Sequence, residues 1–178
     1  KESRKVFSMA GILDTGRYKA FIAEALDISP KDIHALLMGS HGDTMVPLRR
    51  YTSVGGIPVT ELMNKEELDK IIERTRKGGG ELVDLMGTSA WYAPGAAVAE
   101  MVEAIVDDQK RVFPVCAFLN GEYGQKGIYL GVPVKLGKNG IEEVIQLQLN
   151  KNEMKMVEDS ANSVKEVMAV LDDMKLFD

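Results

Sequence analysis

His41, one of two histidines in the chain, lies in the segment Gly39-Ser40-His41-Gly42-Asp43-Thr44, directly after an apolar run at residues 33–38. A strand that ends in a glycine-flanked loop can aim such a side chain into a cleft. Because an imidazole titrates near neutral pH, histidine is the commonest general acid and base in proteins. His41 is therefore the first candidate for a catalytic residue.

A carboxylate and a guanidinium occur upstream, in Asp14-Thr15-Gly16-Arg17. A buried carboxylate can hold an imidazole in one tautomer and favour its protonated form, and a guanidinium offers a planar fork to a substrate carboxylate. Residues three apart share one face of a helix. Asp14, Arg17 and His41 could then form one site. The alternative is that Asp14 is the N-cap of a helix and Arg17 is simply exposed.

Two other kinds of site fit the residues less well. Asp14-Thr15-Gly16 resembles the active-site triplet of aspartic proteases, but that chemistry needs two aspartates sharing a proton, and a single copy would require a homodimer. His41 and Asp43 could ligate a metal, but too few partners accompany them, so no metal site is predicted. For His34, the other histidine, we expect a structural position on its strand.

The apolar periodicity predicts the elements that must position these residues. In the first half it indicates a helix at 14–26, a strand buried on both faces at 33–38, a second strand at 48–54, a helical pattern from residue 60 and a helix at 91–107. Gly78-Gly79-Gly80 interrupts the pattern that starts at residue 60, and local propensity predicts a break there, because each glycine costs about 1 kcal/mol relative to alanine. Packing is the expected role of Trp91.

The second half changes to a period of two residues, typical of strands with one buried face. Strands are expected at 115–119, 128–136 and 145–149, and Asn139-Gly140 marks a hairpin turn, so these strands are antiparallel. Asn150 and Glu153 form a capping pair for a last amphipathic helix that runs to the end. The predicted class is α+β, with antiparallel strands packed against long amphipathic helices.

Composition narrows the functional classes. The 178 residues are 45% hydrophobic and 28% charged, which is typical of one soluble globular domain. A net charge of -5 disfavours nucleic-acid binding, and no apolar run is long enough to span a membrane. A single cysteine, Cys116, favours a reducing compartment, and we expect the cytoplasm. No Gly-x-Gly-x-x-Gly turn is present, so no cofactor-binding residues are assigned within this chain.

Three segments resemble the lactate/malate dehydrogenase family, and most of all the lactate-dehydrogenase-like malate dehydrogenases of bacteria. They are Met-Ala-Gly-Ile-Leu-Asp-Thr-Gly-Arg-Tyr at 9–18, Met-Gly-Ser-His-Gly-Asp-Thr-Met-Val-Pro at 38–47 and Gly-Val-Pro-Val-Lys-Leu-Gly-Lys-Asn-Gly at 131–140. The resemblance implies that residues 1–178 form the C-terminal, substrate-binding domain, without the Rossmann domain that precedes it in the family. The missing glycine-rich turn agrees with this.

The resemblance also implies roles. His41 matches the acid/base that removes the hydroxyl proton of a 2-hydroxy acid, Asp14 the carboxylate paired with it, and Arg17 the clamp on the substrate carboxylate. The substrate pair would be malate and oxaloacetate, and NAD would be bound mainly by the absent domain. Ala90 falls where lactate-specific members often carry threonine, which favours malate. In the family the helix continues through Gly78-Gly79-Gly80, and members assemble as homo-oligomers.

Three functions therefore stay open. The first is the substrate-binding half of an NAD-dependent malate dehydrogenase that neither binds NAD tightly nor turns over oxaloacetate alone. The start, Lys1 to Arg4, favours such a fragment, because it leads almost at once into a strand expected for the family without an initiator methionine. The second is a noncatalytic, free-standing interaction or oligomerisation module. The third is a fragment of a lactate dehydrogenase.

Overall fold

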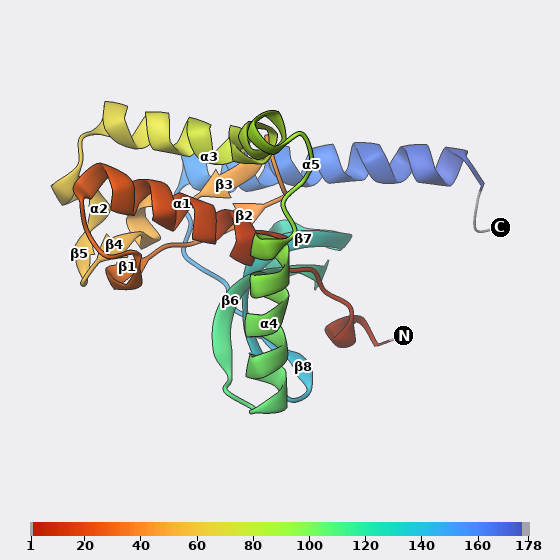
Figure 1. Cartoon of the computed structure of the whole chain (residues 1–178). Coiled ribbons are helices and arrows are strands. Elements are labelled where there is room, and N and C mark those ends of the chain that lie inside the picture. The colour runs from red at the N-terminus through yellow and green to blue at the C-terminus, as the bar shows by residue number, and fades with distance from the viewer. Residues whose placement is uncertain (1, 176–178) are drawn as a thin grey trace.

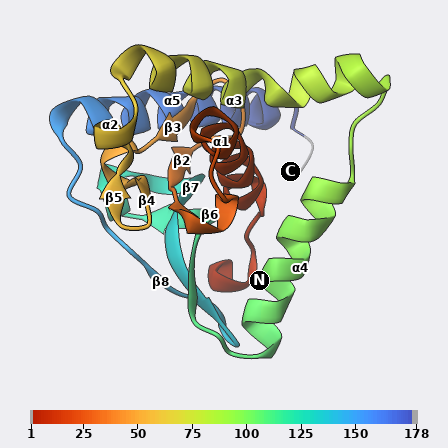
Figure 2. The same ribbon diagram turned by 60° about the vertical axis from the view of Figure 1, so that its left-hand side comes forward.

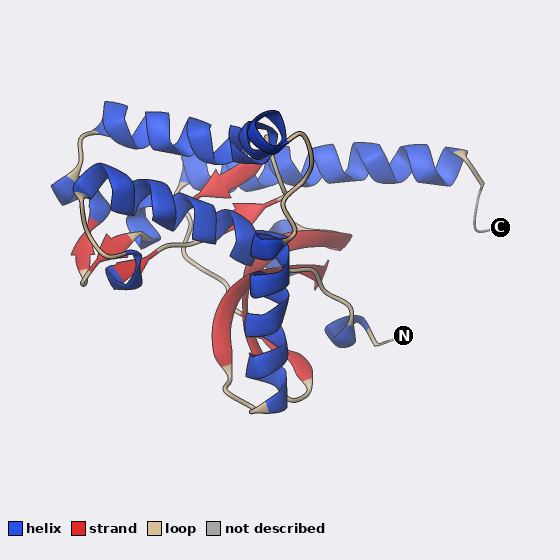
Figure 3. Ribbon diagram, in the orientation of Figure 1, coloured by secondary structure: helices blue, strands red, loops and turns tan. Residues whose placement is uncertain are grey.

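The computed structural model describes residues 2–175, which fold into two antiparallel sheets covered by long helices (Figures 1 and 3). The predicted α+β class is confirmed. The helices are α1 (Ala10–Leu26), α2 (Val59–Leu62), α3 (Lys65–Met86), α4 (Tyr92–Val106) and α5 (Lys151–Asp173). The strands are β1 (Ile33–His34), β2 (Leu37–Gly39), β3 (Met45–Pro47), β4 (Ser53–Val54), β5 (Ile57–Pro58), β6 (Arg111–Asn120), β7 (Lys126–Gly137) and β8 (Gly140–Val144).

The larger sheet has the order β3-β2-β7-β6, and β8 also pairs with β7. Its central strand is β7, which pairs with β2 and β8 and forms a long hairpin with β6, in which Val115 lies opposite Val132. The predicted turn before β8 is confirmed, since β7 and β8 join through Lys138 and Asn139, and Gly140 takes a φ of +85°. The smaller sheet has the order β1-β4-β5. Its strands are short, and it lies beside α1 and α2 (Figure 2).

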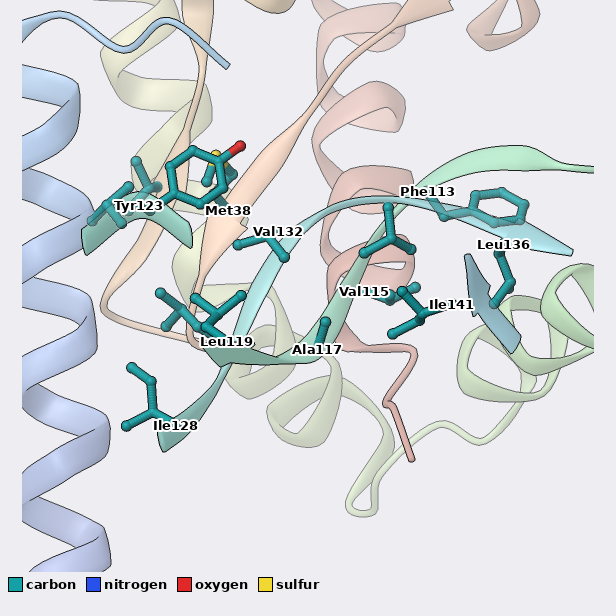
Figure 4. Close-up of a cluster of buried hydrophobic side chains, with 14 of the residues drawn as sticks. Met38, Phe113, Val115, Ala117, Leu119, Tyr123, Ile128, Val132, Leu136 and Ile141 are labelled. Carbon is teal, nitrogen blue, oxygen red and sulfur yellow. The ribbon is translucent and has the colours of Figure 1, made fainter. Parts of the chain in front are cut away.

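Two hydrophobic clusters hold these layers together. In the first, alternate residues of β6 and β7 face inward, among them Val115, Leu119 and Val132 (Figure 4), and pack beneath buried residues of α4 and α5 such as Met101 and Val157. The second cluster joins α1 to α3 and the small sheet, through buried side chains that include Tyr18, Ile22, Ile33, Leu68 and Ile72. Helix α1 therefore lies between the two clusters and contributes to both.

Helix α1 begins four residues earlier than the periodicity predicts. Its N-cap is Met9, so the interpretation of Asp14 as an N-cap is wrong, and this carboxylate lies in the second turn. Gly11 explains the early start, because a Cβ there would clash with the carbonyl of Pro114 on β6. Without a side chain at this position, the first turn of α1 rests directly on the sheet.

Three predicted strands differ from the structure. Residues 33–38 form two strands, β1 and β2, which belong to different sheets, so the single buried strand is wrong. Within 48–54, residues 49–51 form a 3-10 turn, and only β4 is extended. Residues 145–149 lie outside β8 and pair with no full strand, although Ile145 donates a hydrogen bond to the carbonyl of Pro133. Apolar alternation there reflects packing of Leu147 and Leu149 against the core.

The predicted break at Gly78-Gly79-Gly80 is also wrong, because α3 continues through it, as the family resemblance implies. A capping box between Asn64 and Glu67 begins the helix. A Cβ at Gly78 would meet the side chain of Arg17 on α1, within 2.9 Å of its Nε atom. Packing of α3 against Arg17 of α1 therefore explains the glycine at position 78, whereas Gly79 and Gly80 face open space.

Helix α4 agrees with the helix predicted at 91–107, and Pro94 lies in its first turn as expected. Its apolar stripe is only half covered within residues 2–175: Ala97 and Met101 are buried, whereas Val98, Val102 and Val106 are exposed. Trp91 is 75% exposed among residues 2–175, so the prediction that it packs against other residues is wrong for this part of the chain. An apolar strip thus remains uncovered along α4.

Helix α5 confirms the predicted capping pair and depends on one ion pair at its start. Glu153 caps the helix with Asn150 and accepts two hydrogen bonds from Arg50, at 2.9 and 2.6 Å. The Glu153 side chain is only 8% exposed. These hydrogen bonds from Arg50 hold the pKa of Glu153 below its usual value. The ion pair therefore stabilises the fold while the carboxylate is charged.

We expect Glu153→Gln to lower the free energy of unfolding by about 1 kcal/mol at neutral pH, because glutamine keeps the capping box but loses the charged partner of Arg50. Since the folded pKa is depressed, the difference from the wild type should disappear as the pH falls below about 4. Urea unfolding of both proteins at several pH values measures this difference in the free energy of unfolding. Glu158→Gln, at an exposed position of the same helix, is the control and should leave stability unchanged.

Candidate active site

Asp14 and His41 lie in direct contact, although 27 residues separate them in the chain. The Nδ1 atom of His41 is 2.7 Å from Oδ2 of Asp14. A carboxylate accepts hydrogen bonds, so this contact places the imidazole proton on Nδ1 and leaves the lone pair on Nε2. The histidine side chain is 54% exposed, whereas that of Asp14 is 3% exposed. The free nitrogen therefore belongs to a ring that solvent and small ligands can reach.

Arg17 lies one turn further along α1 and binds the other oxygen of the same carboxylate. Its Nη1 atom donates to Oδ1 of Asp14 and to the carbonyl oxygen of Thr75, each at 3.2 Å. Among the described residues, both of these bonds use Nη1, so the Nη2 atom of the guanidinium has no hydrogen-bond partner there, and Arg17 lines the groove described below. The Thr75 carbonyl and the bare backbone of Gly78 explain why α3 is needed here.

Burial dominates the electrostatics of Asp14. Loss of solvent raises the pKa of this carboxyl above its usual value, and the hydrogen bond from His41 and the positive charge of Arg17 oppose that rise. Burial of the ionised Asp14 carboxylate is unfavourable, and other interactions in the folded protein must offset this loss of stability. Such a cost is common where a group is kept for chemistry.

A groove opens beside His41 and Arg17. Its volume is about 530 Å³, and α1, α3 and the start of α4 form its walls. Small or apolar side chains line most of it, and Arg17, His41 and Glu100 are the lining residues whose side chains can carry a charge. Ala90, at the position where the resemblance distinguishes lactate-specific members, is among the lining residues, as are Ser89 and Gly79. The groove can therefore accept a flat, largely apolar group next to the imidazole.

The other candidates lie away from this arrangement. His34 is exposed on β1 and does not line the groove, so its expected place on a strand is confirmed, but it is not packed into the core. Asp43 is exposed and faces a separate, open depression with Arg76 and Lys77. Across residues 2–175, no group of three or more His, Cys, Asp or Glu side chains could hold a metal ion. No helix in this part of the chain has the length and apolarity to cross a membrane.

Sequence reasoning misses two residues that shape the site. Gly78 makes room for Arg17, and Thr75 supplies the carbonyl that orients it. Neither position carries a side chain whose chemistry suggests a site. Three consecutive glycines inside an amphipathic pattern are the one available signal, since such a run costs helix stability unless close packing requires it.

A model of the lactate/malate dehydrogenase α/β C-terminal domain matches residues 12–173. The chain belongs to this family. It is 65% identical over 168 residues to the malate dehydrogenase of Cytophaga hutchinsonii, covering 94% of this chain and 54% of that protein. It therefore spans about half the length of the curated relatives it matches.

Solved structures of the family agree with the fold. The malate dehydrogenase from Salinibacter ruber superposes with a TM-score of 0.97 at 54% identity, over 98% of this chain and 57% of the other. A lactate dehydrogenase from Eimeria maxima, solved with NADH and oxamate, gives a TM-score of 0.90 at 40% identity, over 98% and 57% of the two chains. Both branches of the family therefore share this domain.

We expect Asp14→Asn to raise the melting temperature at neutral pH. Because the folded protein binds the Asp14 proton more tightly than the unfolded chain, ionisation costs stability above the unfolded pKa, and the neutral amide removes that cost. The advantage over the wild type should shrink as the pH is lowered toward about 4. Thermal unfolding across pH measures it, with Asp43→Asn as an exposed control. A destabilised Asp14→Asn protein would show that charge pairing outweighs burial.

Alanine at each of the three glycines of α3 tests the space made for Arg17. Gly79→Ala and Gly80→Ala should each stabilise the protein by about 1 kcal/mol, because alanine favours a helix and open space receives its methyl group. Gly78→Ala should be at least about 1 kcal/mol less stable than Gly79→Ala, because the methyl group displaces Arg17. Urea unfolding compares the three variants directly. Equal gains at all three positions would contradict this account.

Proposed function

We propose that this chain supplies the substrate-binding and acid/base half of an NAD-dependent malate dehydrogenase, which interconverts malate and oxaloacetate. The contact between Nδ1 of His41 and Oδ2 of Asp14, with Arg17 on the same carboxylate, is the observation that carries the proposal. The similarity to malate dehydrogenases such as that of Cytophaga hutchinsonii supports it. The same three residues weigh against a noncatalytic module, because an interaction surface has no use for a buried, charged carboxylate.

His41 performs the acid/base chemistry in this proposal. Its unprotonated Nε2 atom takes the hydroxyl proton of the 2-hydroxy acid, and it returns a proton to the carbonyl oxygen in the reverse direction. Asp14 fixes the tautomer needed for this and stabilises the imidazolium once the proton has moved. The exposure of His41 lets the substrate approach, and the burial of Asp14 keeps the pair from rearranging.

Arg17 orients the substrate through its carboxylate. The Arg17 side chain is 13% exposed, and its Nη1 atom is held by Asp14 and the Thr75 carbonyl, so the guanidinium has a fixed orientation beside the groove. Two parallel hydrogen bonds to a carboxylate would fix the distance between the reacting carbon and His41. Ala90 lies in the groove, and its small side chain supports malate over lactate as the substrate.

The groove fits one end of a nicotinamide cofactor. Its apolar lining beside His41 suits the flat ring, whose role when bound is to accept or donate the hydride. The described residues include no glycine-rich turn at the start of a helix, which the diphosphate of NAD requires. The chain's own residues therefore suit the reactive end of NAD, and a separate NAD-binding domain would hold the rest.

Uncovered apolar surface beside the groove supports such a partner domain. Leu85 is 77% exposed and Tyr92 88% exposed, where α3 gives way to α4. Large apolar side chains exposed close together in the chain are typical of a binding face. We propose that an N-terminal NAD-binding domain and further copies of the protein cover these surfaces, in a cytoplasmic homo-oligomer. On this view the isolated chain neither binds NAD tightly nor reduces oxaloacetate.

A hybrid enzyme tests the proposal. The N-terminal half of the Salinibacter ruber malate dehydrogenase, joined to this chain, should reduce oxaloacetate with NADH, and the 178-residue chain alone should not. His41→Asn in the hybrid should lower kcat by about 10²–10⁴-fold, because the acid/base is lost. Arg17→Ala should lower kcat and also raise KM for oxaloacetate, because the substrate carboxylate loses the guanidinium that binds it. NADH oxidation followed by absorbance measures both.

Three results would contradict the proposal in different ways. Reduction of oxaloacetate by the isolated chain would show that this half is sufficient. A hybrid that prefers pyruvate to oxaloacetate would favour the lactate dehydrogenase assignment. A folded hybrid that binds NADH but reduces neither acid would favour a noncatalytic module. Glu158→Gln, far from the groove, is the control and should leave the rate of the hybrid unchanged.

A further inference from the structure

The loop that carries His41 is tied to the last helix. Ser160 lies on α5 and is fully buried, and its Oγ atom accepts a hydrogen bond from the backbone N–H of Ser40 at 2.8 Å. This bond joins residues 120 apart in the chain. The Ser160 hydroxyl also lies 3.5 Å from Oγ1 of Thr44, whose hydroxyl is in turn hydrogen-bonded to that of Ser40. The hydroxyl groups of Ser160, Thr44 and Ser40 thus form a connected group at the start of the loop that carries His41.

The backbone at this point is shaped to receive that hydroxyl. Gly39 has a φ of +85°, a conformation that other residues rarely adopt, and a Cβ there would lie 2.6 Å from Oγ of Ser160. Glycine therefore serves two needs: the left-handed turn and the close approach of α5. A serine inside a helix usually bonds to a carbonyl of its own helix, as Ser163 does with Asp159 at 3.3 Å. Ser160 instead directs its bonds in the described chain toward the loop.

We propose that Ser160 is a positioning residue that holds the Gly39–Ser40 peptide, at the start of the loop that carries His41, and thereby keeps the imidazole aligned with Asp14. The Ser40 N–H belongs to the Gly39–Ser40 peptide, and Ser40 is the residue adjacent to His41, so a rotation of this peptide shifts the backbone on which the histidine is carried. Asp14 is fixed separately, by the packing of α1. The Nδ1 to Oδ2 contact of 2.7 Å therefore depends on two anchors in different parts of the chain. A displacement of about 1 Å at a reacting group can cost about a hundredfold in rate.

A purely structural role for Ser160 makes a different prediction. Loss of a buried hydrogen bond would lower the stability of the whole domain and affect every part of the sheet alike. Loss of a positioning contact would loosen residues 40–44 and His41 and leave the neighbouring strands β2 and β3 intact. The two roles are separable because Met38 and Val46 pair with each other in those strands and flank the loop.

The first experiment uses the 178-residue chain and does not depend on the proposed function. In Ser160→Ala, the amide of Ser40 should exchange its hydrogen at least about fivefold faster, as expected for the loss of one hydrogen bond. The Nδ1 proton signal of His41 should broaden, and the amides of Met38 and Val46 should keep their protection. Ser163→Ala is the matched control on the same helix and should change none of these NMR signals.

The catalytic consequence rests on the proposed function and is measured in the hybrid enzyme. Ser160→Ala should lower kcat about ten- to a hundredfold and leave KM for oxaloacetate within about twofold, because Arg17 binds the substrate from α1. The primary isotope effect with deuterated NADH should rise, since hydride transfer coupled to His41 becomes limiting. Ser160→Cys, similar in shape but a weaker acceptor, should fall between wild type and alanine.

The outcomes are distinguishable. Unchanged exchange at Ser40 or an unchanged His41 signal overturns the positioning role, and so does an equal loss of protection at Met38 and Val46. If the unmutated hybrid is inactive, the proposed function fails, and the exchange measurement alone decides whether Ser160 positions His41. An active hybrid in which Ser160→Ala has wild-type kcat, or raises KM as much as it lowers kcat, overturns the catalytic consequence.

Discussion

The burial of the Asp14 carboxylate is the constraint on which the rest of the site depends. A charged group that is almost removed from solvent is unfavourable unless both of its oxygens have partners. His41 bonds to one oxygen and Arg17 to the other, so the hydrogen bonds that stabilise the buried carboxylate also orient both of these side chains. Burial itself comes from the place of α1 between two hydrophobic clusters, where Tyr18 and Ile22 are fully enclosed. The geometry of the site therefore depends on the packing of the core around α1.

Glycines occupy three positions where a side chain would prevent the close packing of the elements around the site. Gly11 lets α1 rest on β6, Gly39 accommodates the hydroxyl of Ser160, and Gly78 leaves room for Arg17. Each position gives up local stability, because glycine is the most flexible residue and a poor helix former. What the chain gains is short distances between backbone and functional groups. Three elements can then meet around a single carboxylate.

The site is open on the side that faces the groove, and the same side carries the exposed apolar residues of α3 and α4. This asymmetry agrees with a domain of the lactate/malate dehydrogenase family that spans about half the length of its relatives. The described residues bring together His41, Asp14 and Arg17, to which the proposal gives the acid/base and carboxylate-binding roles, whereas a nucleotide-binding turn is not among them. Substrate recognition and cofactor recognition thus fall on separate parts of the polypeptide in the proposed enzyme.

Residue types and local periodicity were enough to predict the α+β class, the hairpin before β8 and the capping box of α5. Side-chain chemistry also allowed Asp14, Arg17 and His41 to form one site, and the resemblance to a known family assigned them to it. Each of these depends on neighbours in sequence or on side-chain chemistry. Long-range packing determined the rest: the start of α1, the division of residues 33–38 between two sheets, the unbroken α3 and the contact of Ser160 with Ser40. Local propensity cannot predict these features, because the atoms that compensate for an unfavourable glycine or an unusual turn come from residues distant in the chain.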